Sequence, residues 1–252
     1  MRVSAFMWCL LAATTSVEAN TLFPTLETDN DARFGIGLGM LAEDEGYRGI
    51  GTEVEPVPVL YVQTERLRIL GPQLTYRLAG DAASNIGLRL DYRLDGFDAD
   101  DGEVFRGMDK RTGSAALGVA GQFATAFGDL HYSVAKAAAA SKGVYGTVQM
   151  AWPLRGGAWT VTPRAGFEYF DRKFTDYYFG VRAHEVRADR RGYTPSASVN
   201  LDAGIDIQRS FGAQHVVLAS IKYRKFGKDI QDSPLIGKSG SPRFNIGYLY
   251  RF

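Results

Sequence analysis

Residues 85–94 read NIGLRLDYRL, a stretch in which apolar and polar side chains alternate. Ile, Leu, Leu, Tyr and Leu occupy the even-numbered positions from 86 to 94, and Arg89, Asp91 and Arg93 lie between them. Residues at i and i+2 share one face of a β-strand, so the pattern predicts a strand with one apolar and one polar side. The same alternation returns in 159–170, 197–207 and 243–252. The chain is therefore expected to be all-β.

Three features favour a membrane barrel over a soluble β-sandwich, which would show the same alternation. The segments are about ten residues or longer, as tilted membrane strands require, whereas soluble strands average about 5–6 residues. The polar faces carry full charges at mid-strand, and a dry sandwich core accepts unpaired charge only at high cost. Aromatic residues gather near the predicted strand ends, where a girdle at the membrane interface would lie. The aromatic positions are Tyr61, Tyr76, Tyr92, Trp152, Trp159, Tyr169 and Tyr250.

The predicted fold is a transmembrane antiparallel up-and-down β-barrel of about 12 strands, closed by an aromatic C-terminal strand that ends at Phe252. In the third segment, Gly71-Pro72 predicts a bulge or a kink. The twelve segments lie near 33–41, 54–62, 66–79, 85–95, 111–125, 129–138, 144–153, 158–170, 173–182, 194–208, 214–226 and 243–252.

The connections should alternate between long external loops and short periplasmic turns if both ends of the barrel domain are periplasmic. The predicted external loops are 42–53, 183–193 and 227–242. The predicted periplasmic turns are 63–65, 139–143, 171–172 and 209–213. The connection from Gly96 to Lys110 breaks this rule, because it is long and acidic and yet falls on the periplasmic side.

This exceptional connection suggests a docking surface. Its acidic residues lead into apolar side chains, and aromatic groups beside charges are common in binding surfaces. We therefore expect it to bind a periplasmic partner, with a plug folded under the barrel mouth as the alternative. The candidate docking residues are Asp98, Asp100, Asp101, Glu103 and Phe105.

Residues 1–19 have the features of a cleaved signal peptide. Arg2 precedes an apolar stretch over 3–13, and the small residues Val17 and Ala19 suit cleavage. Residues 20–252 would then form the barrel domain of a protein exported to a Gram-negative outer membrane. The single cysteine, Cys9, would be removed, which excludes a disulfide or a thiolate metal site from the mature chain. No later stretch is apolar enough for a transmembrane helix, and a closed barrel is the other structure that spans a bilayer.

The charged and reactive residues point to no reaction and no cofactor. With 29 basic and 28 acidic residues, the net charge of +1 predicts no nucleic-acid partner. His131 and Ser133 share one strand face but lack the third group of a catalytic triad. The three histidines lack the spacing of a zinc site. We therefore expect no catalytic residues, no metal and no cofactor.

The charges of two neighbouring predicted strands should pair with each other. Asp202 and Asp206 share the polar face of one strand, and Lys222 and Arg224 share that of the next. Paired carboxylates can serve acid–base chemistry, but opposite charges on adjacent strands more commonly form a cross-strand ladder. A barrel interior held together by ion pairs is therefore expected.

Three short motifs carry a family resemblance. Tyr177-Tyr178-Phe179-Gly180-Val181 is followed by Glu185, then by Ser233-Pro234-Leu235, and the chain ends in Tyr248-Leu249-Tyr250-Arg251-Phe252. In this combination the chain resembles the MltA-interacting protein (MipA/OmpV) family of outer-membrane proteins over nearly the whole mature sequence.

The resemblance implies a non-catalytic barrel similar to a scaffold that binds a lytic transglycosylase and a murein synthase. It leaves open a narrow passive pore, or an adhesin acting through external loops. The terminal strand also resembles the signal that the outer-membrane insertion machinery recognises. Outer-membrane lipid and that machinery are thus expected partners, and the signal residues are Tyr248, Tyr250 and Phe252.

Overall fold

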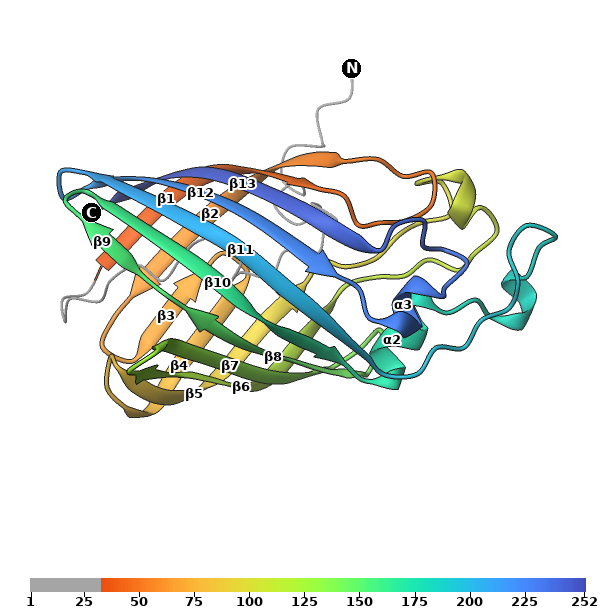
Figure 1. Cartoon of the computed structure of the whole chain (residues 1–252), viewed down its shortest axis with the longest axis horizontal. Coiled ribbons are helices and arrows are strands. Elements are labelled where there is room, and N and C mark those ends of the chain that lie inside the picture. The colour runs from red at the N-terminus through yellow and green to blue at the C-terminus, as the bar shows by residue number, and fades with distance from the viewer. Residues whose placement is uncertain (1–32) are drawn as a thin grey trace, which may run out of the picture.

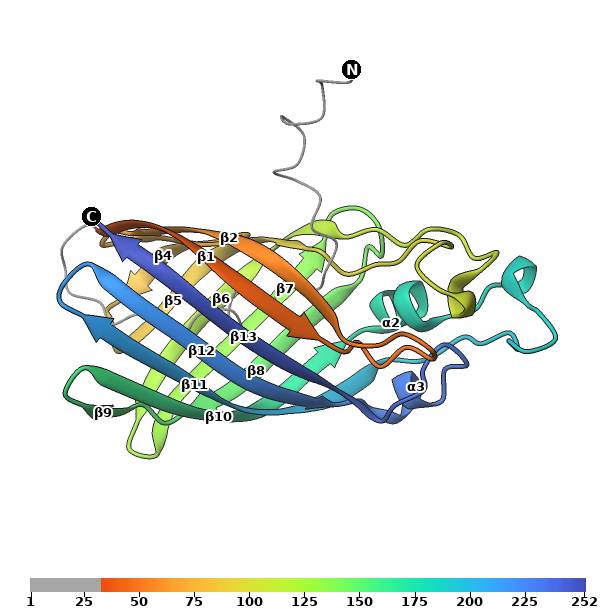
Figure 2. The same cartoon turned by 90° about the horizontal axis from the view of Figure 1, so that it is seen from above.

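The computed structural model describes residues 33–252 as a closed antiparallel β-barrel (Figures 1 and 2). β8 and β9 flank the break at Trp152-Pro153 and both pair with β10, so they form one interrupted strand. β10 also pairs with β11, and β13 with β1, which closes a ring of 12 strands as predicted. The bounds are β1 Arg33–Glu43, β2 Glu53–Gln63, β3 Leu67–Leu70, β4 Gln73–Gly80, β5 Ser84–Arg93, β6 Ser114–Thr125, β7 Gly128–Ala137, β8 Val144–Ala151, β9 Leu154–Gly156, β10 Trp159–Phe170, β11 Ser198–Phe211, β12 His215–Lys225 and β13 Gly240–Arg251.

Two of the predicted strands were wrong, and the two errors cancel in the count. The segment 66–79 is a hairpin of β3 and β4 rather than one bulged strand. Gly71 has φ +55° and Pro72 lacks an N–H, so the chain reverses there instead of continuing. The segment 173–182 is mostly helix α2 (Arg172–Phe179) rather than the ninth strand.

The missed hairpin places several connections at the end of the barrel opposite to the one predicted. The loop 94–113, which contains Gly96 to Lys110, lies at the same end as α2 and opposite the C-terminus (Figure 1). Short turns are typical of the periplasmic end of such barrels and long loops of the external end. Gly96–Lys110 is therefore external, and its predicted periplasmic position was wrong, as were those of 139–143 and 171–172. The connections at this end are 44–52, 94–113, 138–143, 171–197 and 226–239.

The two faces of the wall follow the predicted alternation. On β5, Leu88 and Leu90 point outward with more than two fifths of their surface exposed, whereas Arg89 is 2% exposed and points into the interior, or lumen. Leu201 on β11 points outward in the same way, beside buried Asn200. An apolar outer band and a polar interior are what a bilayer requires. Tyr61 departs from the predicted aromatic girdle, because its side chain is fully buried in the lumen.

Within residues 33–252, two short helices and two 3-10 turns lie outside the barrel wall. They are α2, α3 (Lys228–Gln231), η1 (Glu103–Phe105) and η2 (Ala183–Glu185). No helix within residues 33–252 is long and apolar enough to cross a membrane. The predicted signal peptide, residues 1–19, lies outside the described residues.

Candidate functional site

Helix α2 covers part of the external mouth of the barrel. Asp171 caps its first turn, because its carboxylate accepts a hydrogen bond from the Phe174 amide at 2.8 Å. Phe174 and Tyr178 are one helical turn apart and are both buried, so this face points into the mouth. The Phe174 ring stacks on Phe170 of β10 with centroids 4.3 Å apart. The same apolar cluster includes Ala116, Ala135, Tyr145, Phe226 and Ile230. It joins α2 and α3 to the neighbouring strands β6, β7, β8 and β10, and Figure 2 shows both helices at this end of the barrel.

A second apolar cluster joins the four longest external loops. Phe105 and Phe97 stack at 4.1 Å between ring centroids, and Tyr47 packs edge-on against Phe105 at 4.9 Å. Leu235 is completely buried in this cluster. Its buried members are Tyr47, Phe97, Phe105, Met108, Val181 and Leu235. We call the loops joined by the two clusters, 44–52, 94–113, 171–197 and 226–239, the external cap.

A buried ion pair links two loops of the cap. One guanidinium nitrogen of Arg111 donates to both carboxylate oxygens of Glu185, at 2.8 and 2.9 Å, and both side chains are fully buried. The amides of Asp109 and Arg182 also donate to this carboxylate, at 3.0 and 2.9 Å. Burial alone would raise the pKa of Glu185, but these hydrogen bonds outweigh it and hold the pKa below its usual value. Arg111 also donates to the main-chain oxygen of Tyr177 at 2.7 Å.

The family-motif residues that lie outside the terminal strand all belong to the cap. Tyr177, Tyr178 and Phe179 form the last turn of α2, and Ser233 donates to the main-chain oxygen of Phe179 at 2.7 Å. Gly180 follows the helix where an added Cβ would lie 2.4 Å from the Asp176 oxygen, so a larger residue would displace the backbone. Val181, Glu185 and Leu235 are buried in the same assembly, and Pro234 lies between Ser233 and Leu235. These motifs therefore determine how the cap is packed.

The proposed docking residues form no exposed aromatic surface. Phe105 is 2% exposed, so the predicted apolar anchor is a core residue of the cap. Asp98 pairs with Lys110 at 2.9 Å, and Glu103 pairs with Arg187 at 3.2 Å, both in solvent. Hydrogen bonds from the Lys110 side chain and the Ala99 amide hold the pKa of Asp98 below its usual value. Whether Asp100 and Asp101 contact a partner stays untested.

One cluster of potential metal ligands lies within the described cap. Single ligand atoms of Asp109, His184 and Glu185 lie within 4.8 Å of one another. Arg182 donates to the Asp109 carboxylate and Arg111 to that of Glu185, so each carboxylate already faces a cation. Two guanidinium groups beside the cluster would repel a metal ion. We therefore interpret Asp109, His184 and Glu185 as members of an ion-pair network with Arg111 and Arg182.

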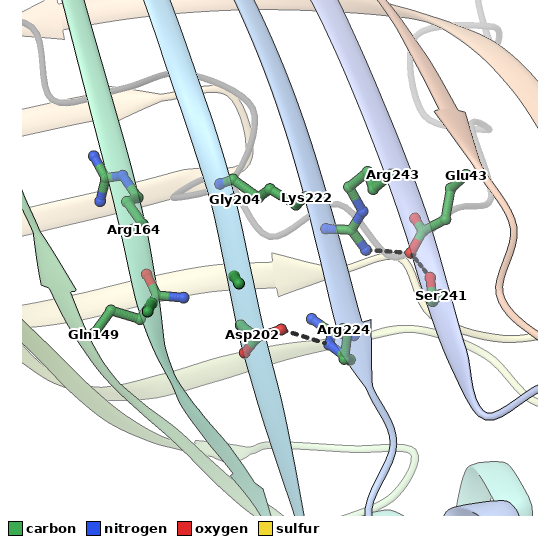
Figure 3. A pocket seen from close by; sticks show the side chains of 11 residues that line it. Glu43, Gln149, Arg164, Asp202, Gly204, Lys222, Arg224, Ser241 and Arg243 are labelled. Carbon is green, nitrogen blue, oxygen red and sulfur yellow. Dashed lines mark hydrogen bonds and ion pairs between the residues drawn. The ribbon is translucent and has the colours of Figure 1, made fainter.

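The lumen contains the predicted charge ladder (Figure 3). Arg224 of β12 lies 3.3 Å from Asp202 of β11 and 2.8 Å from Glu168 of β10. Lys222 lies 3.7 Å from Asp206. Figure 3 also shows Arg243 directed at Glu43 across the β13–β1 seam. On β5, Arg89 pairs with Asp91 at 2.9 Å.

His131 and Ser133 lie on the lumenal face of β7, as predicted. Ser133 shares a hydrogen bond of 2.9 Å with Thr147 of β8, which links two strands. His131 lines a separate hollow near the periplasmic end.

Comparison with known proteins identifies the chain. A family model described as MltA-interacting protein MipA matches residues 36–252. The chain belongs to this family. The MipA-family chain is 26% identical over 228 residues to the MltA-interacting protein of Escherichia coli (strain K12), with 88% of this chain and 91% of that relative covered. The predicted resemblance is thereby confirmed.

Two further relatives of the MipA-family chain are named as outer-membrane proteins. Putative outer membrane protein YiaT of Escherichia coli (strain K12) is 24% identical over 233 residues, covering 91% of this chain and 95% of YiaT. Outer membrane protein OmpV of Vibrio cholerae is 25% identical over 182 residues, 71% of each. Among solved structures, an outer-membrane channel of Pseudomonas putida F1 has a TM-score of 0.41 and 10% identity, covering 90% of this chain and 97% of the channel. This MipA-family barrel is an outer-membrane protein, as predicted.

The cap of this MipA-family barrel is expected to loosen in acid. The pKa of Asp109 is held below its usual value by hydrogen bonds from Arg182 and then His184, and that of Glu185 is lowered as described above. A carboxylate whose pKa is lower in the folded than in the unfolded state stabilises the fold at pH values above its unfolded-state pKa, which is about 4. This stabilisation is lost as the pH falls through the lower pKa of the folded state. Hydrogen exchange in 171–197, corrected for intrinsic rates, should accelerate below about pH 4. Glu185→Gln should flatten this pH dependence, and an unchanged profile would contradict the assignment.

The assembly role of the terminal strand stays a prediction. β13 pairs with both β1 and β12, and Phe252 is 69% exposed at its end, with Tyr248 outward and Tyr250 half-buried. Deleting Phe252 should lower the amount of inserted barrel in cells, measured as the heat-modifiable band in outer-membrane fractions. Phe244→Ala, at an outward position near the start of the same strand, is the control. Equal yields for both variants would show that Phe252 carries no signal.

Proposed function

We propose that this chain is a non-catalytic outer-membrane scaffold that holds a murein-processing enzyme at the periplasmic face of the membrane. The observation that carries the proposal is the closed state of the barrel, in which apolar clusters cover the external mouth and ion pairs cross-link the lumen. Such a barrel is suited to anchoring rather than conduction. A relative is named for its interaction with MltA, which supports a lytic transglycosylase as the partner class. A murein synthase as a second partner rests on the family resemblance alone.

A passive pore agrees less well with this arrangement. The cluster around Phe174 and Tyr178 includes residues of β6, β7, β8 and β10 as well as Phe226 beyond β12, so it crosses the mouth. Below it, Arg93, Glu168 and Arg224 occupy the lumen as buried or nearly buried ionic groups. We expect no steady ohmic conductance when the purified barrel is inserted into planar bilayers.

The docking surface for a periplasmic partner should lie on the rim that carries the short turns. Phe127, in the β6–β7 turn, is 83% exposed, and Leu154 of β9 is 61% exposed. Trp152 donates its indole N–H to the main-chain oxygen of Phe127, which ties the break between β8 and β9 to the β6–β7 turn. β9 pairs only with β10, so one edge of this strand is free among the described residues. This rim replaces Gly96–Lys110 as the surface to test.

A pull-down from solubilised envelopes, read by mass spectrometry, tests the proposal. The wild-type chain should recover a murein-processing enzyme, and the double variant Phe127→Ser/Leu154→Ser should lose it while still inserting. Replacement of 97–107 by a Gly-Ser linker serves as the matched control at the external end and should leave recovery unchanged. If that linker abolishes recovery, the external cap is the docking surface. If no variant changes what is recovered, the scaffold proposal is contradicted.

A further inference from the structure

A hollow opens in the lumen near the periplasmic end of the barrel, away from the cap and the ion-pair ladder. It encloses about 140 Å³, compared with about 30 Å³ for the space beside Asp202 and Arg224. The larger space can hold several waters or a small ligand. Its walls come from β2 to β7 and their short turns. The polar residues that line it include Gln63, Glu65, Arg66, Arg68, Gln73 and Arg77.

The charges around this hollow are unbalanced. Arg66, Arg68 and Arg77 line it with a single carboxylate, that of Glu65, which is exposed at the turn. Arg77 donates to the main-chain oxygen of Glu65 rather than to its carboxylate. Positive charge therefore dominates the space.

Arg68 differs from the other arginines of the lumen. Arg89, Arg164 and Arg224 each pair with an aspartate or glutamate. Within residues 33–252, the Arg68 side chain has no such ion pair and no hydrogen-bond partner, and the charges that act on it include that of Arg164. A partly enclosed guanidinium beside other cations is costly unless an anion compensates it.

Two glutamines that line the hollow have buried side-chain oxygens without partners. Gln73 is 9% exposed, and its Oε1 accepts no hydrogen bond from the described residues, nor does Oε1 of Gln63. A side-chain amide can turn to present its NH₂ group instead of its oxygen. The Tyr61 hydroxyl is also fully buried and unpaired, within the electrostatic reach of Arg68. Unpaired buried polar groups are rare in folded proteins and call for an explanation.

We propose that this hollow is a binding site for a small oxyanion that enters from the periplasm. Arg68 is the anchoring cation, because a guanidinium matches the geometry of a carboxylate or a phosphate. The amide of Gln73, which also lines the hollow, supplies a neutral donor beside it. The site is distinct from the scaffold surface on the rim, and neither proposal depends on the other.

Calorimetric titration of the full-length mature barrel in an uncharged detergent tests this site. Inorganic phosphate and succinate are the two probes, at an ionic strength held constant with sodium chloride, and they separate a phosphate ligand from a carboxylate ligand. At least one of them should bind saturably at one site per chain. Arg68→Gln should weaken this binding about 10- to 100-fold, because a hydrogen bond to a charged group contributes roughly 1.5–3 kcal/mol. The Arg68→Lys variant should keep the electrostatic attraction for the anion but bind it less tightly than the wild type does.

The control is Arg155→Gln, which removes one positive charge from the exposed β9 at the same end of the barrel. Its affinity should equal that of the wild type. Heat-modifiable migration on gels establishes that each variant is folded, and Gln73→Leu provides a second test should Arg68→Gln not fold. No saturable binding of either anion, or equal affinities in wild type and the lumenal variants, would overturn the proposal.

Discussion

Replacing Glu185 with alanine is expected to unfold the external cap while leaving the barrel wall closed. The substitution removes the partner of a fully buried guanidinium and two further hydrogen bonds, those that the carboxylate accepts from the amides of Asp109 and Arg182. Breaking a buried ion pair from one side typically costs about 3–5 kcal/mol, because the remaining charge is uncompensated. The pair links the cap loops 94–113 and 171–197 beside the apolar cluster around Phe105, so a loss of that size should expose these loops.

Limited proteolysis of intact cells, together with hydrogen exchange of the purified barrel, measures this effect. Cleavage within 94–113 and 171–197 should increase strongly, whereas β-strand amides should keep their protection. The double variant Arg111→Met/Glu185→Leu removes both charges and should retain more of the cap than Glu185→Ala alone. Asp98→Ala, which breaks an exposed pair in the same loop, is the matched control and should change little. A cap equally protected in all variants would show that the pair is not needed for its closure.

The arrangement of the wall could be predicted because its sequence pattern is local. Leu90 faces lipid and Arg89 faces the lumen, and the strand period of two separates them without any knowledge of neighbouring strands. The ladder between Asp202 and Arg224 was predictable for a related reason. Consecutive strands of an up-and-down barrel are neighbours, so charges on consecutive polar faces meet.

The reversal at Gly71-Pro72 could not be distinguished locally from a bulge. Arg68 and Leu70 point inward before it, and Gln73 and Thr75 after it, so the inward phase shifts by one residue. A bulge produces the same shift. Only the pairing of Leu70 with Gln73 identifies a hairpin, and that pairing is a tertiary fact. Each missed reversal places every later connection on the wrong side until a second error restores it, which is why Gly96–Lys110 was misplaced.

Helix α2 left a local signal that the strand interpretation overlooked. Asp171 is a favoured N-cap residue, and Phe174 and Tyr178 are spaced by four rather than by two. No local sequence pattern predicts the ion pair of Arg111 and Glu185, since the two residues are 74 positions apart and belong to different loops. The cap therefore emerges only from the fold, and the oxyanion hollow likewise depends on strands β2 to β7 closing around it.

Leu90→Arg is expected to destabilise the inserted barrel by roughly 2–4 kcal/mol, the cost of an arginine near the bilayer midplane on the lipid face. Leu90 is 47% exposed on the outer face at mid-strand, where only hydrocarbon is available to solvate the guanidinium. Leu201→Arg on β11 should cost less, because Leu201 is equally exposed on the outer face but lies nearer the external end of its strand, where the penalty for an arginine falls. Leu90→Met keeps the site apolar and should cost little.

The matched control is Gln149→Arg, which places the same side chain on the lumenal face. Gln149 lies among Arg164 and Asp202 around the lumenal space in Figure 3, where water and the Asp202 carboxylate can accept the new charge. Reversible unfolding in guanidinium chloride with phospholipid present gives the free energies of all four variants. A loss confined to the two outward arginines would locate the bilayer on that face. An equal loss for Gln149→Arg would mean that any added arginine disrupts the barrel, and the assignment of the two faces would then lose its energetic support.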